Sequence, residues 1–189
     1  MSSENRLDDS MGYVVAQGEG ERDAWAQATA GAQRSGGQRL REVAEVIAPV
    51  EVAEAFNLPV GATAVVRRRV MLLDGRPVEL TDSYYPLALA RGTRLAQARK
   101  ISGGAPTLLR ELGHEVRQVA EDVSARLTTD DEQELLGLAR PMPVILLRRT
   151  SKTAVGVPVE VSVMTMLAEG RHLHYEFTVG GDDDAQTGR

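Results

Sequence analysis

The sequence predicts an α+β domain with a mainly antiparallel sheet, built from two similar halves that a pseudo-twofold axis relates. The first observation is that residues 65–83, VVRRRVMLLDGRPVELTDS, have a counterpart in residues 145–162, ILLRRTSKTAVGVPVEVS. Arg68 and Arg69 correspond to Arg148 and Arg149 at an offset of 80. The residues around the following turn correspond at an offset of 81: Gly75, Pro77, Val78 and Glu79 with Gly156, Pro158, Val159 and Glu160. Two copies are too few for a solenoid, so we expect each half to supply one hairpin to a single sheet.

The repeat also decides an ambiguous segment before the first hairpin. The apolar side chains of residues 40–48 have helical spacing, whereas those of the equivalent residues 120–128 alternate as in a strand. Val43 corresponds to Val123 and Ile47 to Leu127, again at an offset of 80. We therefore expect a strand in both places.

A short helix is expected after each of these strands, followed by a hairpin. Residues 50–56 follow Pro49, and residues 129–138 begin at Thr129, a favourable N-cap with three acidic residues behind it. The first hairpin is predicted from residues 65–73 and 77–83, which the turn Asp74-Gly75 joins. The second is predicted from residues 144–150 and 158–166, joined through Gly156.

The segment after the first hairpin is less regular. We expect Tyr84, Tyr85 and Pro86 to leave the sheet, residues 87–98 to be helix or loop, and residues 102–106 to be a glycine-containing loop. Residues 107–113 are predicted to form a short helix. After the second hairpin, residues 173–179 alternate apolar and polar side chains, which predicts a last strand.

These elements place the folded domain at residues 39–179. Residues 1–38 are rich in Gly, Ser, Gln and Ala and are interpreted as a linker or partly disordered segment. Within it we expect at most a short strand at 11–15 and a short helix at 23–33, which carries Trp25. Residues 180–189 are predicted to be a disordered acidic tail.

The composition excludes several classes of function. A net charge of −5 argues against a surface that binds nucleic acid. The absence of Cys removes disulfides and thiol nucleophiles, and it fits a cytoplasmic protein. The polar start has no signal-peptide pattern, and no apolar run is long enough to span a membrane. We find no cofactor-binding or catalytic motif, so we expect neither a cofactor nor an enzyme.

The order of these features resembles the UTRA (UbiC transcription-regulator-associated) domain, the effector-binding half of HutC-type regulators in the GntR family. Residues 53–70, 74–85 and 131–160 carry the resemblance, which extends over residues 40–179. It implies a chorismate-lyase-like fold that encloses a small-molecule pocket and forms a homodimer. It also implies a preceding winged helix-turn-helix, for which residues 1–38 are too few and too acidic. We therefore expect no DNA-binding module, and no direct nucleic-acid binding, in this chain.

The resemblance and the repeat together nominate a set of ligand-binding residues: Arg69, Glu79, Tyr84, Ser102, Arg149, Glu160 and Ser162. A guanidinium fork suits an anionic effector. The alternative is structural, with each arginine paired to the glutamate of its own hairpin. Since residues 84–107 have no counterpart after the second hairpin, we expect one pocket, between the sheet and that segment and near Arg69.

Two further chemistries and two further functions stay open at this stage. Glu79 and Glu160 would suit acid–base catalysis, but the repeat explains both residues without chemistry. His172 and His174, with Glu176, would suit a metal, but an outward polar strand face explains their spacing equally well. An enzyme of the chorismate-lyase-like fold acting on a small carboxylate, or a partner in mixed dimers with a full-length regulator, remains the alternative to an effector-binding domain.

Overall fold

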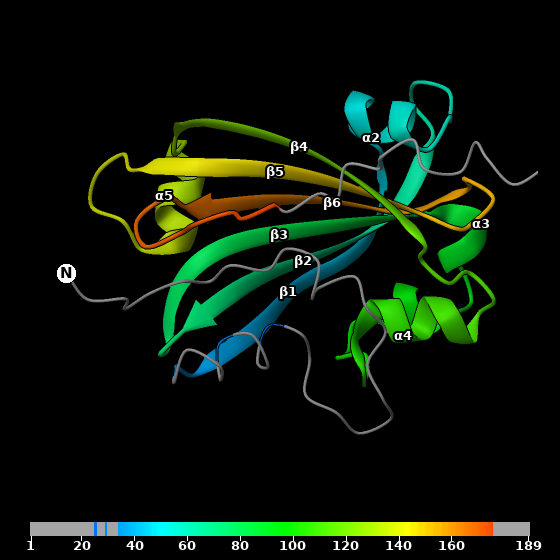
Figure 1. Cartoon of the computed structure of the whole chain (residues 1–189), viewed down its shortest axis with the longest axis horizontal. Coiled ribbons are helices and arrows are strands. Elements are labelled where there is room, and N and C mark those ends of the chain that lie inside the picture. Colours follow the sequence, from blue (N-terminus) through cyan, green and yellow to red (C-terminus); the bar gives the residue numbers. More distant parts are fainter. Residues whose placement is uncertain (1–24, 26–28, 30–33, 176–189) are drawn as a thin grey trace, which may run out of the picture.

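A computed structural model of the chain describes Trp25, Thr29 and residues 34–175. Six antiparallel strands lie side by side in the order β1-β2-β3-β6-β5-β4 (Figure 1). Their bounds are β1 Gly36–Ile47, β2 Thr63–Leu73, β3 Arg76–Pro86, β4 Gln118–Leu127, β5 Pro143–Lys152 and β6 Pro158–Leu167. The helices are α2 Val50–Ala55, α3 Leu87–Ala90, the 3-10 turn η2 Arg94–Ala96, α4 Gly104–Glu111 and α5 Asp130–Leu136.

The strand order confirms the predicted pseudo-twofold, which passes between β3 and β6. Each half runs strand, helix and hairpin, as β1-α2-β2-β3 and then β4-α5-β5-β6. The registers match as well, because Arg69 stands opposite Thr81 and Arg149 stands opposite Ser162. The arginine-bearing hairpins therefore form the inner four strands of one sheet.

The helices cover the two faces of the sheet differently. On one face Val52 of α2 and Phe56, the residue after α2, pack against Val66, while Leu136 of α5 packs against Val70. Figure 1 shows α2 and α5 near opposite ends of the sheet. On the other face the insertion 87–111 packs through Leu95, Leu108 and Leu109 against Val65 and Tyr85. We call this second face the inner face, because it carries most of the candidate site residues.

A β-bulge in β1 explains why residues 40–48 have helical spacing. Leu40 pairs with Arg69 and Glu42 with Arg68, so Arg41 is the extra residue between them. The bulge resets the alternation, and Leu40 and Val43 then both stand opposite inner-face residues of β2, Arg69 and Arg67. The strand prediction from the repeat is confirmed.

The prediction that Tyr84, Tyr85 and Pro86 leave the sheet is wrong. β3 continues to Pro86, with Tyr84 opposite Val66 and Tyr85 opposite Val65. Both rings are buried, Tyr84 beside α2 and Tyr85 beside the insertion, so packing on each face holds the strand straight. The helix predicted at 107–113 also begins earlier, at Gly104, because Gly103 takes a left-handed conformation with φ 72°.

Residues 173–175 contain no strand, so the last predicted strand is wrong over this part. Leu173 instead packs beside Leu147 and Met164 on the inner face. Trp25 and Thr29 are helical and buried, which fits the short helix expected around Trp25. The expected strand at 11–15, the acidic tail at 180–189 and residues 176–179 lie outside the described residues.

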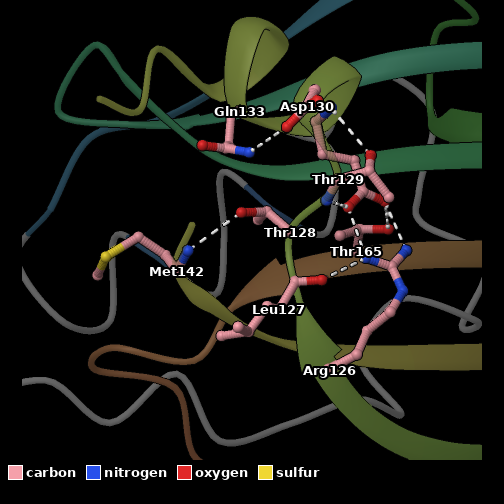
Figure 2. A network of polar contacts seen from close by, with 9 residues as sticks. Arg126, Leu127, Thr128, Thr129, Asp130, Gln133, Met142 and Thr165 are labelled. Carbon is pink, nitrogen blue, oxygen red and sulfur yellow. Dashed lines mark hydrogen bonds and ion pairs between the residues drawn. The ribbon is translucent and has the colours of Figure 1, made fainter. Parts of the chain in front are cut away.

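The sequence predicted Thr129 as the N-cap of α5, and the structure shows a full capping box there. The Thr129 hydroxyl accepts from the Glu132 amide, and the Glu132 carboxylate accepts from the Thr129 amide. Arg126 of β4 donates to both oxygens of that carboxylate, at 2.6 and 2.7 Å. Figure 2 shows Arg126 and Thr165 converging on this cap. The hydrogen bond from Arg126 is the largest cause that lowers the pKa of Glu132 to about 2.

Candidate functional site

A small pocket lies between the inner face and the insertion, at the place that the sequence predicted. Its volume is about 70 Å³, and it is lined by Gln38, Leu40, Arg67, Arg69, Tyr85, Lys100, Ile101, Gly104 and Ala105. β1, β2 and β3 supply one wall, and the residues that lead into α4 supply the other. The lining contains three cationic side chains and, among the described residues, no carboxylate. Such a pocket suits an anion.

Arg67 ties the insertion to the sheet. Its Nη1 donates to the carbonyls of Arg94, Leu95 and Gln97, and its Nη2 donates to the Arg99 carbonyl at 2.8 Å. The side chain is buried, and burial lowers the pKa of its guanidinium. All four acceptors are backbone carbonyls, which carry no net charge. None of these contacts therefore neutralises the positive charge of the Arg67 guanidinium.

Arg69 lies two residues further along β2, on the same face. Its Nη2 donates to Ser83 Oγ at 2.7 Å. Its Nε is buried and has no hydrogen-bond partner among the described residues. A buried N–H without a partner is costly, and a ligand oxygen would satisfy it.

Glu160 and Ser162 meet Arg69 indirectly, through a chain of buried hydroxyls. Ser83 Oγ lies 2.8 Å from Ser162 Oγ, and Ser162 donates to Glu160 Oε1 at 2.9 Å. Tyr85 donates its hydroxyl to the same oxygen at 2.9 Å. Burial is the main reason why the pKa of Tyr85 lies well above its usual value, with the Glu160 charge adding to it. Neither Glu160 nor Ser162 belongs to the pocket lining.

Glu79 forms an ion pair away from the pocket. Its Oε2 accepts from Arg171 at 2.9 Å and its Oε1 from Thr81 at 2.8 Å. The Arg171 guanidinium also lies 5.5 Å from the centre of the Trp25 ring, within cation–π range. The expected pair between Arg69 and Glu79 is therefore replaced by one between Arg171 and Glu79.

Arg149 is held on the second half of the sheet. Its Nε donates to Glu121 Oε1 at 2.6 Å, and both side chains are less than a tenth exposed. The expected partner was Glu160, but Arg149 stands opposite Ser162 on β6 and opposite Glu121 on β4. The strand register therefore favours an ion pair of Arg149 with Glu121 over one with Glu160.

Tyr84 and Ser102 lie apart from the pocket. Tyr84 faces the opposite side of the sheet, where it packs with Phe56, and Ser102 is exposed. Their neighbours Tyr85 and Ile101 line the pocket instead. The alternation of β3 would have found Tyr85, had the strand been extended past Ser83. Lys100 had no comparable signal, because a loop has no side-chain period.

No helix in the described part of the chain is long and apolar enough to cross a membrane.

Residues 32–170 match the model of the UTRA domain. The chain is 30% identical to an uncharacterized HTH-type transcriptional regulator of Streptomyces coelicolor over 153 residues, 79% of this chain and 56% of that protein. It is 31% identical to an HTH-type transcriptional regulator of Mycobacterium tuberculosis over 138 residues, 70% of this chain and 47% of that protein. The chain thus spans about half the length of the curated relatives it matches.

Solved structures share the fold. The match to PhnF from Mycobacterium smegmatis has a TM-score of 0.75 at 20% identity and covers 94% of this chain and 73% of that one. The match to the ligand-binding domain of a GntR-family transcriptional regulator from Bordetella bronchiseptica has a TM-score of 0.64 at 27% identity and covers 77% and 91%. These matches confirm the expected fold class. With most of its length in the matched region, the chain belongs to the UTRA domain family and is an effector-binding domain of the GntR regulator type.

Proposed function

We propose that the chain senses a small anionic effector, and that Arg69 holds the anionic group in the pocket beneath the insertion. The observation that carries this proposal is the buried Arg69 Nε, which has no partner among the described residues, in a lining with three cations and no described carboxylate. A guanidinium binds carboxylate or phosphate oxygens through paired N–H donors. The bound anion would supply the missing acceptor.

The size of the pocket limits what enters it. A volume of about 70 Å³ is below the roughly 300–1,000 Å³ of pockets that hold drug-sized ligands. It suits the anionic end of an effector, and a larger effector requires residues 100–105 to move outward. Gly103 and Gly104 both have positive φ, which a residue with a side chain rarely adopts, so they permit a turn here that other residues would resist.

The same proposal extends to the protein as a whole. We infer a cytoplasmic homodimer that regulates transcription and is not an enzyme, since the matched relatives are transcriptional regulators. Direct binding of duplex DNA by this chain is not expected at a net charge of −5. Strong, salt-dependent binding to duplex DNA would contradict that part.

A thermal-shift screen tests the proposal. Sugar phosphates, amino-acid derivatives and fatty acids are screened against the wild-type protein and the Arg69→Ala variant. Arg148→Ala serves as the control, because it also removes a strand arginine, but one that does not line the pocket. The Arg148 side chain is about a third exposed and pairs with Asp122. A ligand at about 100 times its dissociation constant adds roughly 2.7 kcal/mol to the stability of the folded state.

The expected result is an anionic compound that raises the Tm of the wild type and of Arg148→Ala but not that of Arg69→Ala. Hits that are all neutral or cationic would contradict an anionic effector. A hit that shifts Arg69→Ala as much as the wild type would place the site elsewhere.

A further inference from the structure

Arg69 and Tyr85 both line the pocket, and a chain of hydrogen bonds behind the pocket wall joins them. It runs from Arg69 to Ser83, Ser162 and Glu160 and returns to Tyr85. The contact between the two serines crosses from β3 to β6, which is where the two halves of the sheet meet. Arg69 belongs to the first half and Glu160 to the second.

The direction of every hydrogen bond in this relay is fixed by chemistry. Tyr85 and Ser162 both donate their hydroxyl protons to Oε1 of Glu160. Ser162 has then used its one proton and can only accept from Ser83. Ser83 has used its own proton in turn, so its oxygen is left to accept from Arg69, whose guanidinium only donates. Both serine protons therefore point toward Glu160, and the Ser83 oxygen can accept from Arg69.

Burial makes the relay sensitive to the loss of one member. Ser83, Ser162 and Glu160 are each less than a tenth exposed, and Tyr85 is fully buried. In such surroundings a lost acceptor is not readily replaced by water. The bond to Ser83 is also the one side-chain hydrogen bond that the described residues give Arg69.

We propose that Glu160 is a positioning residue for Arg69: acting through Ser162 and Ser83, it fixes the guanidinium in the orientation that receives the anion. The second half of the sheet thus sets the affinity of a pocket built on the first half. The affinity part of this inference rests on the proposed function, in which Arg69 contacts the anion. The positioning part concerns the ligand-free protein and stands by itself.

Ser162→Ala tests the relay at its middle, and Ser162→Thr restores the hydroxyl. Ser151→Ala is the matched control, since Ser151 is a buried serine of the adjacent strand β5 and the relay does not include it. The first measurement is the NMR order parameter of the Arg69 Nε–H bond without ligand. A rigid group has a value near 0.85 and a flexible one falls below about 0.6. The second is titration with inorganic phosphate as the probe anion.

We expect Arg69 to be rigid in the wild type, Ser151→Ala and Ser162→Thr, and flexible in Ser162→Ala. The dissociation constant for phosphate should rise about tenfold in Ser162→Ala, as for one lost hydrogen bond, and Ser162→Thr should recover it. Ser83→Ala breaks the relay one step nearer to Arg69 and should give the same two losses. It provides the test if Ser162→Ala does not fold.

An equally rigid Arg69 in Ser162→Ala and Ser83→Ala would overturn the inference. Unchanged phosphate affinity in both variants would overturn its affinity part, provided that Arg69→Ala weakens binding. If Arg69→Ala leaves phosphate binding unchanged, the proposed function fails instead, while the order parameters still decide whether the relay through Ser162 and Ser83 positions Arg69.

Discussion

Arg68 and Arg148 occupy equivalent positions in the two halves, and each pairs with an acidic residue of the neighbouring edge strand. Arg68 pairs with Glu42 of β1 and Arg148 with Asp122 of β4. The acids are also equivalent, at the offset of 80 that relates the arginines. On this side of the sheet the pseudo-twofold therefore preserves an ion pair.

On the inner face the next arginine of each half is treated differently. Arg149 stands opposite Glu121 and forms a buried ion pair with it. Arg69 stands opposite Leu40. The residue equivalent to Glu121 is Arg41, which is the extra residue of the β-bulge and has no pairing partner on β2. The insertion 87–111 also follows the first half, and the described residues after β6 contain no counterpart. The comparison teaches that the pocket lies in the half where no acid stands opposite the inner-face arginine and where the insertion covers the sheet.

The largest expected effect is on the stability of the second half. Arg149→Ala leaves the buried Glu121 carboxylate without its guanidinium, which should lower the free energy of unfolding by about 3–5 kcal/mol. Arg69→Ala should lower it by less than about 1 kcal/mol, since it removes a single bond to Ser83. Urea unfolding of both variants measures the difference.

The double variant Arg149→Leu with Glu121→Leu is the control for this prediction. Removing both charges should restore much of the lost stability, because no charge then remains buried and unpaired. Equal destabilisation by Arg69→Ala and Arg149→Ala would break the comparison between the halves.

The cover over the first half should depend on Arg67, whose counterpart in the second half is Leu147. Arg67→Met removes the donor of four backbone carbonyls and should cost about 2–3 kcal/mol. Hydrogen exchange of the amides in residues 94–105 should accelerate more than that of β5. Unchanged exchange in this segment would mean that apolar packing alone holds it.

Leu40→Glu should turn the first half into a copy of the second on the inner face. The new carboxylate stands opposite Arg69, as Glu121 stands opposite Arg149, and competes with an anionic ligand for the guanidinium. We expect phosphate affinity to fall about tenfold, the value of roughly 1.4 kcal/mol. The free energy of unfolding, measured in urea, should change little. Unchanged phosphate affinity would show that Arg69 binds the anion even when a carboxylate stands opposite it.

The smallest effect concerns the caps of α5 and α2. Thr129 and Glu132 form a capping box at α5, whereas Pro49 at α2 provides no side-chain cap. Thr129→Ala should therefore cost about 1 kcal/mol in urea unfolding. The pKa of Glu132 is lowered to about 2 from 4.5, so its contribution is complete above about pH 4.5 and is lost as the pH falls toward 2. The difference in stability between the wild type and Glu132→Gln should shrink over that range.

The repeat made the sheet predictable because both halves meet the same packing demands. The offsets at Arg68, Gly75 and Glu79 predicted the two hairpins and their place in one sheet. The end of β3 was not predicted, since Tyr84 and Tyr85 are held in the strand by packing on opposite faces of the sheet. A local pattern does not contain that tertiary support.

The place of the candidate pocket was predicted, but most of its lining residues were not. The asymmetry of the repeat indicated the insertion, whereas Arg69 was proposed from the repeat and the family resemblance together. The partners of Glu79 and Arg149 were missed, because Arg171 and Glu121 reach them from outside their own hairpins. Contacts between segments 28 or 92 residues apart depend on the assembled sheet and leave no short-range signal in the sequence.

Titration of phosphate into Arg69→Ala and Arg149→Ala, side by side, tests the central claim most directly. The two variants remove equivalent guanidiniums from the two halves of one sheet. We predict that Arg69→Ala weakens binding by about 2 kcal/mol, as for one charge-assisted contact, while folded Arg149→Ala retains the affinity of the wild type. Equal losses, or a loss only in Arg149→Ala, would contradict a site on the first half.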